Sequence, residues 1–185
     1  MQVQLNYLSF PKYLELEQTS PIRHEYLGGQ IFAMSGSSEE HNLIAGNIHA
    51  LLRSHLRGSF CRTFISDMKV RIESTDVSYY PDVMVVCEPQ DRDRYFKTCP
   101  CLIVEILSPT TAATDKREKL LNYQKISSLR EYVLVAQDEM KIEVYRQDNL
   151  GNWYLQTLGK DEQLSLESVN LSMTMAEIYE DVLTA

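Results

Sequence analysis

The chain of 185 residues is 44% hydrophobic and 24% charged, proportions typical of one globular domain with a proper core rather than of a disordered protein. Its formal net charge is −8, whereas proteins that hold nucleic acid through phosphate contacts are usually basic or carry a basic patch. The balance therefore argues against a strong, sequence-indifferent DNA binder, but it is compatible with acids gathered around a metal ion.

Targeting signals and metal-type cysteine spacing are not evident in the sequence. No apolar run approaches the ~20 residues that span a bilayer, and residues 1–6 lack the basic and then apolar pattern of a secretory signal. We therefore expect a cytoplasmic protein without a membrane partner. The four cysteines are expected to be reduced thiols without a role: Cys61, Cys87, Cys99 and Cys101.

The N-terminal elements are a short helix and a hairpin. Residues 11–18 predict a helix with proline in its first turn. Two β-prone runs then flank Gly28-Gly29, a pair that tolerates the positive φ angles of a tight hairpin turn. Glu25 stands on this hairpin. An exposed charge there and an acid directed toward a site are equally compatible with the pattern.

A longer helix follows. Ser37 and Glu40 are spaced as a capping box, and the apolar pattern runs to about Arg57. His41 lies on the apolar face in the first turn, and His55 lies on it near the end. For both histidines we favour a core or capping role over catalysis. His41 is the stronger candidate for a site, because helix starts attract anions.

Two strands are predicted next, over residues 61–65 and 68–72. The second alternates apolar residues with Lys69 and Arg71, which is typical of a half-buried strand with one solvated face. Residues 88–98 have mixed charge and predict a polar surface loop.

Two apolar strands each carry one acid. Pro81-Asp82 leads into the run Val83–Cys87, and Glu105 lies in the middle of the run from Pro100 to Pro109. An ionised carboxylate inside an apolar strand is costly without a partner such as a metal ion or another cation. If both strands are central, the two carboxylates meet at a common point and form a site for a hard cation.

A helix from about Ala112 to Lys125 follows the second of these strands. By 3.6-residue counting, Lys116 projects from within its apolar face, while Asp115 and Lys119 flank the edge of that face. The helix would therefore direct at least one lysine toward the strand ends. The alternative is that Asp115 and Lys119 form an ordinary surface pair worth ~0.2–0.5 kcal/mol.

The remaining pattern predicts strands and one helix. A buried strand covers 131–136, an edge-like strand covers 140–146, a hairpin partner covers 153–158 and a short strand lies near 164–166. The last helix begins at a capping box formed by Thr174 and Glu177.

This order of elements and acids resembles the PD-(D/E)XK nuclease superfamily, and most closely a large bacterial endonuclease family within it. The matching pieces, between about residues 20 and 146, are Glu25-Tyr26, Gly29-Gln30-Ile31, Met34, Pro81-Asp82-Val83, Val104-Glu105-Ile106-Leu107-Ser108-Pro109, Asp115, Lys119, Tyr123 and Glu131-Tyr132. The resemblance implies an α/β (mixed α+β sheet) restriction-endonuclease-like fold with an α-β-β-β-α-β core. We expect a single domain over residues 1–185, with an N-terminal hairpin and a C-terminal hairpin plus helix.

The same resemblance implies an endonuclease that hydrolyses DNA phosphodiester bonds with Mg²⁺, for which Mn²⁺ can substitute. Asp82, Glu105 and the backbone carbonyl of Ile106 are then the expected metal ligands, since Mg²⁺ favours oxygen donors. Lys119 is the expected catalytic lysine, which stabilises developing negative charge. Glu25 is expected to be an auxiliary acid. Nucleases of this fold often act in pairs, which leads us to expect a homodimer.

One position departs from the superfamily pattern. The lysine usually found two residues after the glutamate is replaced by Leu107. The resemblance favours Lys119 as a displaced substitute, with Lys116 as its competitor. An alternative function is an inactive nuclease-fold module that binds DNA or protein, which Leu107 and the net charge both favour. A purely structural role, with Asp82 and Glu105 paired to arginines, is disfavoured because such buried pairs are costly.

Overall fold

The computed structural model describes residues 7–109 and 111–183. In chain order the elements are α1 (Phe10–Thr19), β1 (His24–Leu27), β2 (Gln30–Ala33), α2 (Glu39–His55), β3 (Arg62–Ile65), β4 (Lys69–Ile72), the 3-10 turn η1 (Glu73–Thr75), β5 (Val77–Tyr79), β6 (Val83–Val86), β7 (Phe96–Lys97), β8 (Leu102–Leu107), α3 (Ala112–Thr114), the π-helical turn η2 (Asp115–Lys119), α4 (Leu120–Tyr123), β9 (Glu131–Ala136), β10 (Ile142–Gln147), β11 (Trp153–Leu158), β12 (Gln163–Leu166), β13 (Leu171–Thr174) and α5 (Met175–Ile178).

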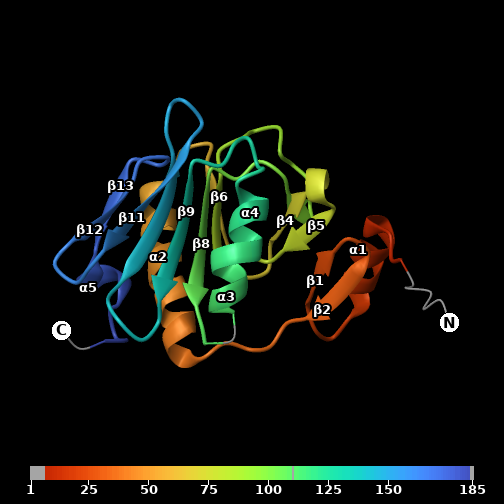
Figure 1. Cartoon of the computed structure of the whole chain (residues 1–185), viewed down its shortest axis with the longest axis horizontal. Coiled ribbons are helices and arrows are strands. Elements are labelled where there is room, and N and C mark those ends of the chain that lie inside the picture. The colour runs from red at the N-terminus through yellow and green to blue at the C-terminus, as the bar shows by residue number, and fades with distance from the viewer. Residues whose placement is uncertain (1–6, 110, 184–185) are drawn as a thin grey trace.

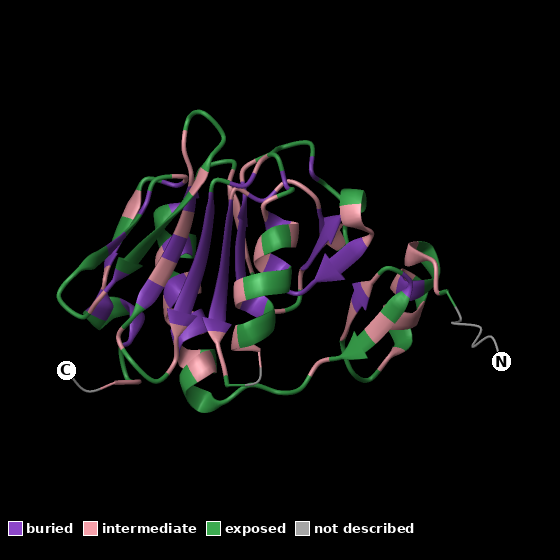
Figure 2. Cartoon of the chain, in the orientation of Figure 1, coloured by how far each residue is buried: buried purple, intermediate pink, exposed green. Residues whose placement is uncertain are grey.

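A six-stranded sheet in the order β11-β10-β9-β8-β6-β3 forms the centre of the molecule. Its strands pair antiparallel except for β8 and β9, which are parallel. Helix α2 covers one face of this sheet, and the segment α3-η2-α4 covers the other (Figure 1). Because both faces are covered, β6, β8 and β9 read as continuous apolar runs, and Figure 2 shows them as the buried centre.

A second sheet, in the order β2-β1-β5-β4-β7, packs with α1 beside the central sheet. The predicted tight hairpin is present between β1 and β2, and Gly28 and Gly29 both adopt positive φ angles, 55° and 89°. In the described part of the chain, no helix combines the length and apolar character that crossing a membrane requires.

The mixed α+β fold expected from the sequence is confirmed, but several local predictions are wrong. Helix α2 is capped by Ser38, whose Oγ accepts a hydrogen bond from the backbone N–H of His41, and not by Ser37. The predicted hairpin between residues 140–146 and 153–158 is present as β10 and β11, but β11, and not the edge-like β10, lies at the edge of the sheet. The short strands β5, β7 and β13 were not predicted as strands.

Strand β4 is not half-solvated. Lys69 and Arg71 are buried because aromatic rings lie over the face that the alternation assigned to water: Tyr80 over Lys69, and Phe10 and Tyr26 over Arg71. The Arg71 guanidinium lies 4.0 Å from the centre of the Phe10 ring and 2.6 Å from Asp76 Oδ1. Aromatic faces and one carboxylate replace water around this cation.

Two cysteines differ from the expectation of reduced thiols. Cys61 and Cys87 form a disulfide, while Cys99 and Cys101 are free. Cys61 precedes β3 and Cys87 follows β6, and the antiparallel register that pairs Arg62 with Val86 places the two cysteines opposite each other. Their separation of 26 residues carried no signal of this pairing.

Candidate active site

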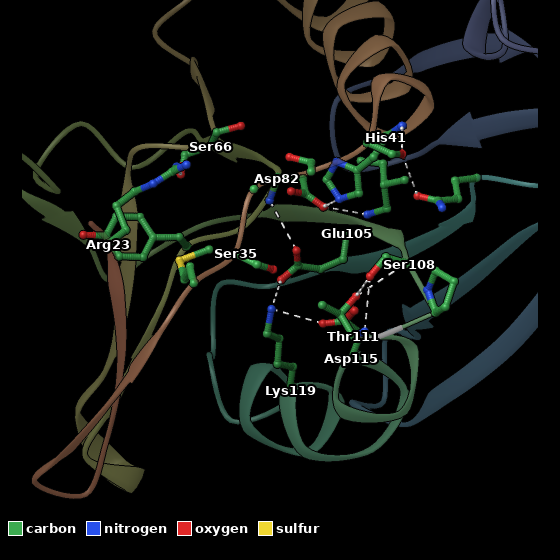
Figure 3. Close-up of a pocket in the computed structure, with 18 residues that line it drawn as sticks. Arg23, Ser35, His41, Ser66, Asp82, Glu105, Ser108, Thr111, Asp115 and Lys119 are labelled. Atoms are coloured by element: carbon green, nitrogen blue, oxygen red, sulfur yellow. Dashed lines mark hydrogen bonds and ion pairs between the residues drawn. The ribbon is translucent and has the colours of Figure 1, made fainter. Parts of the chain in front are cut away.

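Strand pairing brings Asp82 and Glu105 together. Strands β6 and β8 pair Val83 with Val104, so Asp82, just before β6, lies beside Glu105. The backbone N–H of Asp82 donates to Glu105 Oε2 at 3.3 Å, and the N–H of Ile106 donates to Asp82 Oδ2 at 2.8 Å. Glu105 is 3% exposed, and the Asp82 side chain faces a cleft (Figure 3). The two acids thus share one point at the ends of two central strands.

Lys119 reaches this point from η2. Its Nζ lies 3.1 Å from Glu105 Oε1, 3.1 Å from Asp115 Oδ1 and 3.2 Å from Glu25 Oε1. The lysine side chain is 8% exposed, so these contacts form away from bulk water. The structure therefore gathers Glu25, Glu105 and Lys119, which the sequence predicts for the site, and places Asp115 among them.

Lys116 points elsewhere. Its Nζ lies 2.6 Å from Glu143 Oε1, on the part-exposed side of the helix. The helical phase that placed Lys116 inside the apolar face was wrong, because η2 is a π-helical turn and does not follow the 3.6-residue period. For the same reason Asp115 and Lys119 are buried and do not form a surface pair.

Lys119 approaches Glu105 from the face of β8 on which residue 107 lies, where the superfamily usually has its lysine. Residues 103, 105 and 107 alternate to the same face of β8, and Leu107 packs there against the core cluster that contains Ile103 and Tyr123. The segment α3-η2-α4 covers this face, so a lysine from η2 approaches Glu105 from the side where a lysine at 107 would stand.

Two tyrosines complete the surroundings of the lysine. Tyr123 OH donates to Glu105 Oε1 at 2.9 Å, and Tyr132 OH donates to the backbone carbonyl of Asp115 at 3.1 Å. The sequence does not predict a site role for Tyr123, and it predicts Asp115 only as the partner of Lys119 in a helix pair. The four-residue spacing of Asp115, Lys119 and Tyr123 was the available signal, because all three are buried along one line of the helix.

His41 also belongs to the cleft. Its Nε2 lies 3.2 Å from Asp82 Oδ2, so its ring is neither in the core nor at the helix cap. His55, by contrast, contacts the backbone carbonyl of Val169 at 3.0 Å and has a structural position, as we favoured. The partners of Asp82 and Glu105 are thus a histidine, a lysine and a tyrosine rather than the arginines that a purely structural pairing required.

Electrostatics at the site are dominated by burial and by excess negative charge. Burial raises the pKa of Glu105 well above the ordinary value, and Asp82, Asp115 and Glu25 raise it further, while Lys119 opposes them. Burial likewise raises the pKa of Glu25. For Lys119, burial lowers the pKa, but the carboxylates of Glu105, Glu25 and Asp115 outweigh it and the net direction is upward. Lys119 is therefore an ammonium at neutral pH.

A divalent cation fits this donor set. Three carboxylates, Glu105, Glu25 and Asp115, contact Lys119, and Asp82 lies beside Glu105, so the four acids exceed the lysine by three negative charges when all are ionised. His41, which contacts Asp82, offsets one of these charges when it is protonated. Among residues 7–109 and 111–183, no three His, Cys, Asp or Glu side chains are grouped so that they alone could hold a metal. Asp82 and Glu105 would need the Ile106 carbonyl, water or substrate oxygens as further ligands, a mixture that suits Mg²⁺.

The cleft that opens onto these acids has a volume of about 270 Å³. Its walls are the segment 34–38, the first turn of α2, Arg23 and the turn after β8 (Figure 3). Serines and glycine dominate the segment 34–38, so this part of the rim is polar and its side chains are small.

A mixed sheet that carries two acids on adjacent strands, with a helix packed over them, defines a protein of the restriction-endonuclease-like class. A model of the Uma2 family, described as "Putative restriction endonuclease", matches residues 10–176, and the chain belongs to this family. The family and the fold support a nuclease function in general terms.

Two curated relatives come from Synechocystis sp. (strain ATCC 27184 / PCC 6803 / Kazusa). Uncharacterized protein slr1290 is 38% identical over 173 residues, which are 93% of this chain and 91% of the relative. Uncharacterized protein sll1609 is 30% identical over 168 residues, 89% of this chain and 95% of the relative. A crystal structure of a "putative nuclease belonging to DUF820" from Anabaena variabilis superimposes with a TM-score of 0.78 at 20% identity, and the match covers 95% of this chain and 99% of that one. This likeness shows the fold.

Proposed function

We propose that the protein is a Mg²⁺-dependent endonuclease that hydrolyses phosphodiester bonds of DNA, with Mn²⁺ as an effective substitute. The observation that carries the proposal is the contact of Lys119 Nζ with Glu105 Oε1 at 3.1 Å, beside Asp82 in an open cleft. Mg²⁺ bound there would lower the pKa of a water molecule and neutralise charge on the scissile phosphate.

The chain's own residues have separate parts in this proposal. Asp82 and Glu105, with the backbone carbonyl of Ile106, hold the cation. Lys119 stabilises the negative charge that develops on the phosphate, a role that its burial among carboxylates suits because the ammonium stays charged. Glu25 is an auxiliary acid that shares the lysine.

Cleavage of supercoiled, linear double-stranded and single-stranded DNA, with Mg²⁺, Mn²⁺ or EDTA, tests the proposal. We expect metal-dependent cleavage that Asp82→Ala and Glu105→Ala abolish. Lys119→Ala should lower kcat by roughly 10²–10³-fold, the usual loss when a charge-stabilising donor is removed. Lys116→Ala is the matched control, because that lysine pairs with Glu143 outside the cleft.

The alternative function, an inactive nuclease-fold module that binds DNA or protein, keeps support from Leu107 and from the net charge of −8. It predicts that the folded wild type cuts no DNA form with any metal, and that binding survives in Asp82→Ala. Light scattering on the same samples measures whether the protein is the homodimer that we expect for a nuclease of this fold.

A further inference from the structure

We propose that Asp115 is a positioning residue that holds the Lys119 ammonium against Glu105, and that the π-helical turn η2 directs both side chains into the site. The inference rests on the proposed function, in which the place of Lys119 decides how well it meets charge on the phosphate. Asp115 would act through Lys119 and would not touch the substrate.

The contacts of Lys119 show why it needs such a residue. A lysine ammonium ends a flexible four-carbon chain, and a single ion pair does not fix its direction. Here three carboxylates surround Nζ at 3.1–3.2 Å. Glu105 is the proposed metal ligand and Glu25 comes from the separate β1-β2 hairpin, so Asp115 is the partner whose backbone belongs to the same turn as the lysine.

Burial distinguishes this pair from an ordinary helix-surface pair. The side chains of Asp115 and Lys119 are 2% and 8% exposed. Asp115 Oδ1 is buried and accepts no hydrogen bond from the described residues, among which its polar contact is the ion pair with Lys119. A carboxylate buried in this way would be costly to keep unless its charge served the lysine.

The π-helical turn gives the pair its direction. Asp115 and Lys119 are both buried, whereas Lys116, between them, turns outward to Glu143. From the adjacent strand β9, Tyr132 donates a hydrogen bond to the backbone carbonyl of Asp115, which fastens the turn to the sheet. Single π turns inside α-helices are often found at functional sites because they redirect side chains in this manner.

The kinetic test compares Asp115→Asn with wild type. We expect kcat to fall about 10- to 100-fold, the usual loss for a residue that supports a site residue, with KM for DNA unchanged. Asp115→Glu, which restores the charge, should recover part of the loss. In a Lys119→Met background, Asp115→Asn should have no further effect on kcat, because its partner is gone. Glu143→Gln is the matched control, since it breaks the pair between Lys116 of the same turn and Glu143 of β10, outside the cleft.

A second readout does not depend on activity. The NMR signal of the Lys119 ¹⁵Nζ ammonium, assigned with Lys119→Met, should shift or broaden in Asp115→Asn and stay in place in Glu143→Gln. If wild type cleaves no DNA but this shift occurs, the proposed function fails while the placement of Lys119 by Asp115 stands. If cleavage occurs and Asp115→Asn matches wild type, or lowers kcat equally in both backgrounds, the positioning role is wrong. Should Asp115→Asn not fold, Asp115→Ala, which also removes the carboxylate that contacts Lys119, carries the same comparisons, and wild-type values for both its kcat and its ¹⁵Nζ signal overturn the proposal.

Discussion

At the scale of single residues, Glu25 changes the charge balance of the site more than its place on a hairpin would suggest. Its Oε1 lies 3.2 Å from Lys119 Nζ, and burial raises its pKa. Glu25 and Glu105 both contact this lysine, and the negative charge of Glu25 repels that of Glu105 and so raises the pKa of Glu105. Glu105 must lose its proton before it can bind a cation, so Glu25 affects the pH at which the site becomes competent.

We therefore expect Glu25→Gln to move the acid limb of the pH–rate profile to lower pH. Wild-type activity should rise with pH through the raised pKa of Glu105, which lies above the ordinary 4.5. With one neighbouring negative charge removed, that pKa falls and the limb moves toward 4.5. The measurement is kcat/KM against pH at fixed Mg²⁺. An acid limb that stays in place, or moves upward, would show that Glu25 does not influence Glu105.

The residues of the site differ in how far the sequence predicts them. Asp82 and Glu105 stand out because each is one acid in or beside an apolar strand, and pairing of two such strands brings them together. The choice between Lys116 and Lys119 is not available from helical phase, because a π turn adds a residue that the sequence does not mark. His41 was placed on an apolar face, but its first-turn position exposes it to Asp82.

At the scale of elements, Arg71 on β4 contacts both α1 and β1, and the packing of α1 on the second sheet depends on it. Its guanidinium lies 4.0 Å from the Phe10 ring centre and 5.5 Å from that of Tyr26, and it pairs with Asp76. Since Arg71 is buried, these ring contacts form with little competition from water. The arginine thus connects one helix, one hairpin and one strand.

Arg71→Met should lower the free energy of unfolding by about 2 kcal/mol, mostly from the lost cation–π contacts and hydrogen bonds. Arg23→Met is the control and should change stability by less than about 0.5 kcal/mol, because the Arg23–Asp67 pair is exposed. Urea unfolding at neutral pH measures both. Equal losses of unfolding free energy in the two variants would show that the buried contacts of Arg71 stabilise the fold no more than an exposed ion pair does.

The ion pair between Arg71 and Asp76 makes part of the folding stability depend on pH. Burial raises the pKa of Asp76, but hydrogen bonds from Arg71, Tyr7 and Tyr26 outweigh it and the net direction is downward. A depressed acid pKa stabilises the fold fully above the ordinary value of 3.8, and this contribution is lost as the pH falls through the folded-state pKa. The difference between wild type and Arg71→Met should therefore narrow below pH 3.8.

Helices and strands are predicted correctly where the spacing of apolar residues and the residues that favour turns or caps indicate the same element. The tight hairpin, the buried strands and the capping box at Thr174 follow directly from local residues. The two-residue strand β7 and the burial of β4 depend on partners distant in the sequence, and alternation alone assigned Lys69 and Arg71 to water. The Cys61–Cys87 pairing depends on strand register, which the spacing of cysteines does not contain.

At the scale of the whole molecule, the acids behind the net charge of −8 differ in how much free energy their ionised forms cost the folded protein. Surface acids are solvated, but the three carboxylates that contact Lys119 exceed its charge by two when all are ionised, and they have little access to water. Such a cluster opposes folding of the metal-free chain, since like charges in a dry site repel strongly. A divalent cation that binds the folded state alone should relieve this repulsion and raise stability.

We expect Mg²⁺, Mn²⁺ and Ca²⁺ each to raise the Tm of the wild type by about 5–10 °C at a concentration near 100 times Kd, relative to NaCl of equal ionic strength. Ca²⁺ reports binding without the need for cleavage. The shift should be largely lost in Glu105→Gln and Asp82→Asn, and it should weaken as the pH falls toward 5, because protons compete for a Glu105 whose pKa is raised. Glu143→Gln should keep the full shift, since Glu143 pairs with Lys116 outside the cleft. A shift of equal size in Glu105→Gln would place the bound cation elsewhere and would separate the acid cluster from metal binding.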